Sequence, residues 1–187
     1  MDKKSIIQIS RGDEVTLKKV ITLDNIAIVE AIIPLRDVDG GNFTKVIIES
    51  GFEWIEEVRC NTYIKSLAKI VSFDTQAWMT NASKIISRSY GIPLPLHPGV
   101  VLVPVKVRIA EYKDEGTNGY VNLLKIEGME RVDKKITRLF FASGLEVDVI
   151  SSYGNLNPLL IQARCCYEIQ FKSFRNFFKQ KNIYHNI

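Results

Sequence analysis

Alternating apolar and polar residues predict two short strands at the start of the chain. Residues 5–10 place Ile7 and Ile9 on one face and Ile6 on the other, which is the period of a strand. A turn follows, and residues 15–21 return as a second strand. The chain is therefore expected to begin with a strand, a turn and a strand.

The next apolar segment predicts a more deeply buried strand. Residues 26–33 are nearly all apolar and β-branched, which is typical of a central strand covered on both faces, and Pro34 is expected to end it. Turn-forming residues at 37–42 lead to a further strand at 45–49. The aspartates of this turn lack the glutamate that ends a calcium loop, so we interpret them as turn residues.

From Trp54 onward the apolar spacing changes from that of strands to that of helices. A wide apolar stripe at helical spacing is formed by Tyr63, Ile64, Leu67, Ala68, Ile70 and Val71. Asp74 is suited to cap a second helix, in which Trp78, Ala82, Ile85 and Ile86 share a face. We interpret Trp78 as a core residue rather than as a stacking platform for a ligand.

The proline-rich segment 91–99 ends this helical region. Its three prolines exclude a helix or a central strand, so we expect an extended connector. It is the best internal boundary and divides the chain into residues 1–90 and 91–187, which we expect to form one compact unit. Residues 100–109 resume as a strand, and Pro104 inside them predicts an edge strand or a bulge.

Residues 120–150 predict three more strands. The first covers residues 120–127, and a charged turn follows at 131–135. Residues 136–142 and 145–150 then form a hairpin across Ser143-Gly144. In its second strand the apolar and acidic residues alternate, so one face is expected to be buried and the other exposed to water.

A long last helix is predicted from Pro158 to about Phe178, with Asn157 as its cap. The phenylalanines near its end exceed what one apolar face needs, and we expect Phe171, Phe174 and Phe178 to contact a second copy of the chain. Together the elements predict an α+β fold of mainly antiparallel strands, with two helices after the N-terminal strands and a long C-terminal helix.

The formal net charge of +4 is modest, but the charges are unevenly distributed. No acidic residue occurs between Asp74 and Glu111 or after Glu168, whereas both segments carry Lys and Arg. Such segments favour binding to a phosphate backbone, because each cation that contacts it releases counterions. The alternative is an ordinary solvated face whose acidic partners come from other parts of the fold.

Known catalytic and metal-binding motifs are missing from the sequence. We find no phosphate-binding loop, dinucleotide fingerprint, zinc-protease motif or nucleophile elbow, and no motif places a partner for His97 or His185. The three cysteines lack ligand spacing, so we expect reduced, buried thiols. We therefore expect no metal, no cofactor and no enzymatic activity. No apolar run could span a membrane and no signal peptide is visible, which predicts a cytoplasmic protein.

Several short segments occur in an order and approximate spacing that are similar to those of one family. They are Trp-Ile-Glu-Glu-Val-Arg-Cys (54–60), Ile-Pro-Leu-Pro-Leu (92–96), Val-Pro-Val (103–105), Asn-Gly-Tyr-Val-Asn (118–122), Phe-Ala-Ser-Gly (141–144) and Gln162. Over most of the chain, to about Ala163, this series resembles the ComK competence transcription factors. The chain departs from the family pattern where Phe-Pro-Thr becomes Val-Pro-Val and where Tyr120 replaces a tryptophan.

The resemblance implies a transcription activator that binds AT-rich double-stranded DNA as a homo-oligomer and reaches into the minor groove. It also implies RNA polymerase and an adaptor–protease system as partners. Minor-groove reading relies on Arg, Lys or Asn, so the lack of a helix-turn-helix pattern is no objection. The valine replacements favour an alternative, a protein-interaction or regulatory module that kept the fold and lost DNA binding.

We expect DNA contact from basic residues on the irregular strand at 100–109, on the following hairpin and after the second helix. These residues are Arg88, Lys106, Arg108, Arg131, Lys134, Lys135 and Arg138. Charge reversal at Lys106 and Arg108 is expected to weaken salt-dependent binding of an AT-rich duplex.

Overall fold

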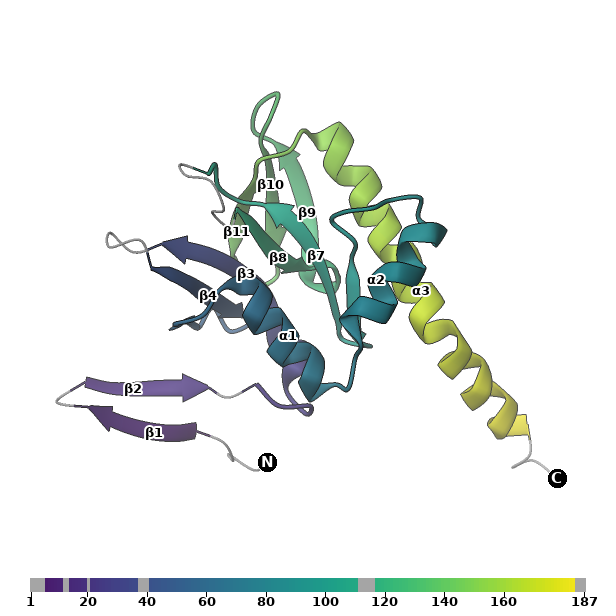
Figure 1. Cartoon of the computed structure of the whole chain (residues 1–187), viewed down its shortest axis with the longest axis horizontal. Helices are drawn as coiled ribbons and strands as arrows, with labels where there is room; N and C mark the ends of the chain where they lie inside the picture. Colours follow the sequence, from purple (N-terminus) through teal and green to yellow (C-terminus); the bar gives the residue numbers. More distant parts are fainter. Residues whose placement is uncertain (1–5, 12–13, 20, 37–40, 111–116, 184–187) are drawn as a thin grey trace.

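The structure is a computed structural model that describes residues 6–11, 14–19, 21–36, 41–110 and 117–183, and side chains within 21–36, 41–110 and 117–172. The prediction of an α+β fold is confirmed: the strands pair antiparallel, two helices follow the N-terminal strands, and a long helix ends the chain (Figure 1). The two predicted N-terminal strands, β1 (Ile6–Arg11) and β2 (Glu14–Lys19), pair with each other as a separate hairpin.

A six-stranded antiparallel sheet forms the centre of the molecule, in the order β5-β4-β3-β8-β7-β6. The two parts of the chain on either side of residue 90 meet within it, because Ala31 and Ile32 of β3 pair with Val121 and Tyr120 of β8. The strands are β3 (Val29–Arg36), β4 (Asn42–Ile48), β5 (Glu53–Glu56), β6 (Leu94–His97), β7 (Val100–Lys106) and β8 (Asn118–Asn122).

Each face of this sheet is covered by a different layer, which gives the molecule two hydrophobic cores. Helices α1 (Cys60–Ile70) and α2 (Thr75–Ile85) cover one face, where Ile32 and Leu102 are buried. A three-stranded sheet and helix α3 (Tyr153–Ile183) cover the other, where Ala31 and Val101 are buried. The smaller sheet has the order β11-β10-β9 and consists of β9 (Ile126–Arg131), β10 (Thr137–Phe141) and β11 (Glu146–Val149). Neighbouring residues of a strand enter opposite cores because successive side chains point to opposite faces.

The expectation that Pro34 ends its strand is wrong. β3 starts at Val29, after the short 3-10 helix η1 (Ile26–Ile28), and continues through Pro34, which pairs with Thr44 of β4. The pairing of β3 with β8 stops at Ile32, so Pro34 lies beyond the paired part of β3 on its β8 side. A proline is tolerated at such a place because no ladder bond is required from its missing N–H.

The prediction of an edge strand or bulge around Pro104 is correct only for the end of the strand. β7 lies between β6 and β8, but β6 pairs with it no further than Leu102, so Pro104 has an open side. The predicted connector contributes β6 itself, as the outer strand of the sheet. Trp54 also lies in a strand, β5, and the helical region begins only at Cys60.

The predicted capping of α2 is confirmed. The Asp74 carboxylate accepts hydrogen bonds from the backbone N–H groups of Gln76 at 2.9 Å and Ala77 at 3.0 Å, which satisfies donors at the helix start. Trp78 packs against the core, as expected, and its indole N–H donates to the carbonyl of Pro93 at 2.8 Å. This bond fixes the segment between α2 and β6 against the helix.

Helix α3 begins five residues earlier than predicted, at Tyr153 rather than Pro158. The N–H groups of Asn155 and Leu156 donate to the carbonyl of Ser152, and Leu156 is buried in the core, so core packing sets the start of the helix. Pro158 therefore lies in the second turn, where its missing N–H costs one helical bond. Among the helices of the described residues, none is long and apolar enough to cross a membrane.

Candidate nucleic-acid interface

Four of the predicted basic residues lie around the first turn of α3. Arg88 follows α2, Lys106 ends β7, Arg131 ends β9, and Lys134 lies in the connection between β9 and β10. They line three hollows together with residues at the start of α3. We call this region the α3-start surface; it consists of Arg88, Lys106, Arg131, Lys134 and residues 151–155.

The start of α3 separates the basic residues into two pairs. On one side, Arg131 and Lys134 line a hollow of about 490 Å³ with residues 152–154. On the other side, Arg88 and Lys106 line a hollow of about 240 Å³, which Ser151 connects to a neighbouring one of about 540 Å³. Three segments far apart in the sequence thus bring cations to one end of a helix.

No acidic residue is among the described residues that line these three hollows. The first N–H groups of a helix add a partial positive charge at the same place. The cations and the helix start favour phosphate groups in these hollows, and the nearby Asp133 carboxylate is occupied by backbone N–H groups of its own turn.

Arg88 is held in place by uncharged groups. Its Nε donates to the carbonyl oxygen of Tyr90 at 2.8 Å, and its Nη1 donates to Oε1 of Gln162 at 3.1 Å. The centre of the guanidinium also lies 5.5 Å from the centroid of the Tyr90 ring. These partners orient the guanidinium but do not neutralise its charge.

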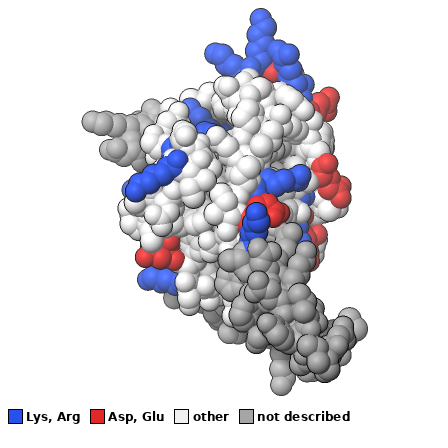
Figure 2. Space-filling view, turned by 90° about the vertical axis from the view of Figure 1, so that its right-hand side faces the viewer, with Lys and Arg blue, Asp and Glu red and all other residues white. Residues whose placement is uncertain are grey.

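The turn between β9 and β10 presents the second pair. The Asp133 carboxylate accepts hydrogen bonds from the backbone N–H groups of Lys135 and Ile136, which shapes the turn. Arg131, Lys134 and Lys135 are exposed. Figure 2 shows Lys and Arg side chains projecting at the upper end of the molecule, where Figure 1 has the β9–β10 hairpin. The other cations on the face in Figure 2 are separated by uncharged surface and by acidic residues, so this face is not one continuous basic patch.

Arg138 lies apart from the α3-start surface and is compensated by two acidic residues. Its Nε and Nη2 donate to the two carboxylate oxygens of Asp148 at 2.7 and 3.0 Å, and its Nη1 donates to Glu146 at 3.0 Å. This hydrogen-bonded pairing lowers the pKa of Asp148 and raises that of Arg138. Arg138 stabilises its own sheet and is poorly suited to bind phosphate.

Arg108 is also separate from the α3-start surface. It is half-buried, and its charge acts on the buried thiol of Cys60 at the start of α1. Burial raises the pKa of Cys60, and this increase is partly offset by a hydrogen bond with Thr44 and by the Arg108 charge. The sequence places Arg108 two residues after Lys106, but the strand has ended between them.

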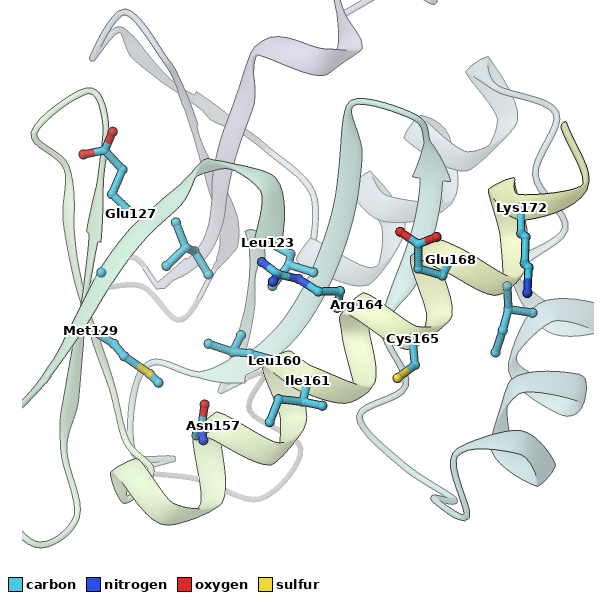
Figure 3. Close-up of a pocket in the computed structure, with 13 residues that line it drawn as sticks. Leu123, Glu127, Met129, Asn157, Leu160, Ile161, Arg164, Cys165, Glu168 and Lys172 are labelled. Carbon is cyan, nitrogen blue, oxygen red and sulfur yellow. The ribbon is translucent and has the colours of Figure 1, made fainter. Parts of the chain in front are cut away.

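A second surface, which the sequence did not predict, is a groove between β9 and α3. It has a volume of about 680 Å³, and Figure 3 shows Met129 of β9 pointing toward Leu160 of α3 across it. Ile161 is 57% exposed and Ile169 is 43% exposed on the helix wall. The charged residues of the lining have both signs: Glu127, Arg164, Glu168 and Lys172. The groove therefore differs from the α3-start surface in being apolar and electrically mixed.

The remaining predicted residues are distributed as follows. Phe171 is half-buried and its ring lies 5.2 Å from that of Tyr167, whereas the side chains of Phe174 and Phe178 lie outside the described residues. The expectation of buried thiols holds for Cys60 and Cys166 but is wrong for Cys165, which is exposed in the groove. Within the described part of the chain, no group of three or more metal-ligating side chains is present.

Sequence reasoning did not assign Gln162, Tyr90, Ser151 or Asn155 to the predicted site. Gln162 matched a position of the ComK-like series, but nothing in the sequence placed it beside Arg88. Tyr90, Ser151 and Asn155 belong to the site only because α3 starts earlier than Pro158 and because the chain after α2 folds back onto α3.

Comparison with known proteins gave no match: no protein-family model, no curated protein and no solved structure matches this chain. The resemblance to the ComK family consequently stays a prediction from the sequence.

Proposed function

We propose that the protein is a DNA-binding transcription regulator that contacts AT-rich duplex DNA through the α3-start surface. The observation that supports this proposal is the convergence of Arg88, Lys106, Arg131 and Lys134 from separate segments around hollows whose described lining includes no acidic residue. An ordinary solvated face would not be expected to concentrate cations from separate segments at one helix end. Lys135 adds a further exposed cation beside this surface.

The physical basis of binding is the release of counterions from the DNA. Four phosphate contacts predict that the logarithm of the binding constant falls with the logarithm of salt concentration with a slope of about −4. Arg and Lys side chains also suit a narrow, AT-rich minor groove, where the negative potential is strongest. The proposal includes what the ComK resemblance implies, a homo-oligomer that works with RNA polymerase and an adaptor–protease system. It also includes the cytoplasmic location and the lack of enzymatic activity that the sequence motifs predict.

Fluorescence anisotropy with a labelled AT-rich duplex tests the proposal across a range of salt concentrations. The wild-type protein should bind with the steep salt dependence given above. The double variant Lys106→Glu/Arg131→Glu should bind at least about tenfold more weakly, because two attractive contacts become repulsive. Lys65→Glu/Lys69→Glu on α1 is the matched control, since it changes the net charge equally on exposed residues of another element.

Two results would count against the proposal. A wild-type protein that ignores duplex DNA at low salt would refute DNA binding itself. Equal weakening by the α1 control would refute the location, because net charge rather than the α3-start surface would then control affinity.

The groove between β9 and α3 supports a second candidate, a protein-interaction module. β9 is the outer strand of its sheet, and its outer side opens toward the groove, since four consecutive residues, 126–129, line it. An extended peptide can pair with such a strand. Because α3 forms the opposite wall, a single extended segment of a partner fits better than the sheet edge of a second copy.

Peptide selection tests this candidate. Displayed peptides selected on the wild type and counter-selected on Ile161→Glu should include alternating apolar sequences that bind only the wild type. Peptides that bind both proteins equally would exclude the groove as their site. If DNA binding is absent and groove-specific peptides are found, the module is the better description of the protein.

A further inference from the structure

The chain between α2 and β6 folds back so that Arg88 reaches α3. Two residues in it adopt the left-handed backbone region, Ser87 with φ of 52° and Gly91 with φ of 62°. This conformation is uncommon for a non-glycine residue such as Ser87 and turns the chain sharply. The side chain of Arg88 thereby contacts Gln162, which is 74 residues away in the sequence.

Gln162 holds this segment at two points. Its Oε1 accepts a hydrogen bond from Nη1 of Arg88, and its Nε2 donates to the carbonyl oxygen of Ile86 at 3.4 Å. The first bond orients the guanidinium, and the second, longer bond ties the end of α2 to α3. Gln162 is half-buried, so both bonds are partly protected from water.

Tyr90 completes the arrangement from the other side. Its carbonyl oxygen accepts from Nε of Arg88, while its ring, in a residue that is 76% exposed, lies beside the guanidinium. The two hydrogen bonds use Nε and Nη1, and a guanidinium carries further N–H donors on its fork. Arginine is thus oriented before any ligand arrives, which reduces the entropy lost on binding.

The hollow beside Arg88 offers other donors suited to an oxyanion. Its lining includes the hydroxyl-bearing residues Ser87, Ser89 and Ser151 and the amide of Asn155, within a volume of about 540 Å³. No carboxylate is among the described residues that line it. Hydroxyl and amide groups beside an arginine match the acceptor oxygens of a phosphate.

We propose that this hollow binds one backbone phosphate of the DNA through Arg88, and that Gln162 is the positioning residue that aims Arg88 at it. The proposal rests on DNA binding by the α3-start surface and assigns one contact within it. The neutrality of Gln162 is part of the proposal, because a carboxylate at the same place would pair with Arg88 and cancel its charge.

A double-mutant cycle measured by anisotropy tests the assignment. Arg88→Met should weaken binding about tenfold for AT-rich and GC-rich duplexes alike and reduce the magnitude of the salt slope by about 1, as expected for a phosphate contact. Gln162→Met should weaken binding about threefold in the wild-type background and have no effect in the Arg88→Met background. Gln162→Glu should reduce the salt slope like Arg88→Met.

Controls separate positioning from folding. Gln76→Met, at an exposed residue of α2, should leave binding unchanged. Urea denaturation of each variant identifies any loss that comes from unfolding. If Gln162→Met weakens binding equally in both backgrounds, Gln162 acts on the fold and the positioning role is overturned.

Three other outcomes would test the role of Arg88, the hollow and the proposed function separately. If Arg88→Met affects only the AT-rich duplex, Arg88 reads a base and the phosphate assignment is wrong. If wild type binds but Arg88→Met binds equally well, the hollow is not a DNA contact although the proposed function stands. If the wild type does not bind duplex DNA, the proposed function itself fails.

Discussion

Among the buried polar residues of the described chain, Asn122 has the most complete set of hydrogen-bond partners. It is fully buried, and its Oδ1 accepts from the N–H groups of Val101 at 3.0 Å and Leu124 at 3.2 Å. Its Nδ2 donates to the carbonyls of Val29 at 2.9 Å and Gly99 at 3.1 Å. One side chain therefore joins β3, β7 and the turn that leaves β8.

Asn122→Ala should lower the free energy of unfolding by about 3 kcal/mol, because four backbone groups lose their partner in the interior. Urea denaturation followed by circular dichroism measures the loss. Asn81→Ala, at an exposed residue of α2, should change stability by no more than about 0.5 kcal/mol. A loss at Asn122 no larger than at Asn81 would show that water replaces the amide without cost.

The cysteines should differ strongly in reactivity. Burial raises the pKa of the Cys60 thiol and raises that of Cys166 to about 11, whereas Cys165 is exposed. At pH 8 roughly 0.1% of Cys166 is thiolate even before its limited access is considered. We expect one thiol to react rapidly with a disulfide reagent in the native protein and all three to react in denaturant. Loss of the fast reaction in Cys165→Ser identifies it, and a second fast thiol would contradict the prediction.

At the scale of elements, the β10–β11 hairpin carries its own electrostatic stabilisation. Arg138 on β10 bridges Glu146 and Asp148 on β11 across the exposed face of the sheet. All three side chains are partly exposed, so the pairing contributes modestly and is weakened by salt. The alternation of buried Val147 and Val149 with Glu146 and Asp148 confirms the predicted orientation of this strand.

The pairing predicts a pH dependence of stability. Because the folded-state pKa of Asp148 is lowered, its contribution is present above its unfolded pKa of about 3.9 and is lost as pH falls through the folded value. Urea denaturation between pH 6 and 3 should show a smaller loss of stability for Asp148→Asn than for wild type. Asp24→Asn, at an exposed residue, is the control, and an identical pH dependence of Asp148→Asn and wild type would contradict the prediction.

At the scale of the whole molecule, the central sheet joins both parts of the chain. The joint is narrow, since β3 and β8 are paired at only two residues of each strand, Ala31 with Val121 and Ile32 with Tyr120. Gly119 lies beside it, where an added Cβ would be 2.8 Å from the carbonyl oxygen of Ile32. Close approach of two backbones thus requires glycine at this point.

We expect both parts of the chain to unfold in a single transition, because neither has a complete sheet without the other. Trp54 and Trp78 report on the first part by fluorescence, and a dye on Cys165 reports on the second. Their urea midpoints should coincide, and Gly119→Ala should lower both together. Two separate midpoints would show that residues 1–90 and 91–187 behave as independent domains.

Local pattern determined much of the secondary structure. The period of two in β11, the helical stripe of α1 and the Asp74 cap of α2 depend on neighbours within a few residues, and all three are present in the structure. The α+β class follows from the same local information. The sequence predicted the start of α3 too late because Asn157-Pro158 is by itself a good helix start. The true start depends on the burial of Leu156, which only the rest of the fold provides.

For the candidate site, the sequence alone established which basic residues were available, but not which of them lie together. The sequence identified acid-free basic segments and named the cations, but it could not separate Arg88 and Lys106 from Arg108 and Arg138. Arg138 is poorly suited to bind phosphate because it pairs with acidic residues on the adjacent strand. Arg108 lies apart from the α3-start surface because β7 ends at Lys106. Both effects arise from pairing between segments distant in sequence. Charge and hydrophobic period are local properties of the chain, whereas convergence of charges on one surface exists only after the tertiary fold brings those segments together.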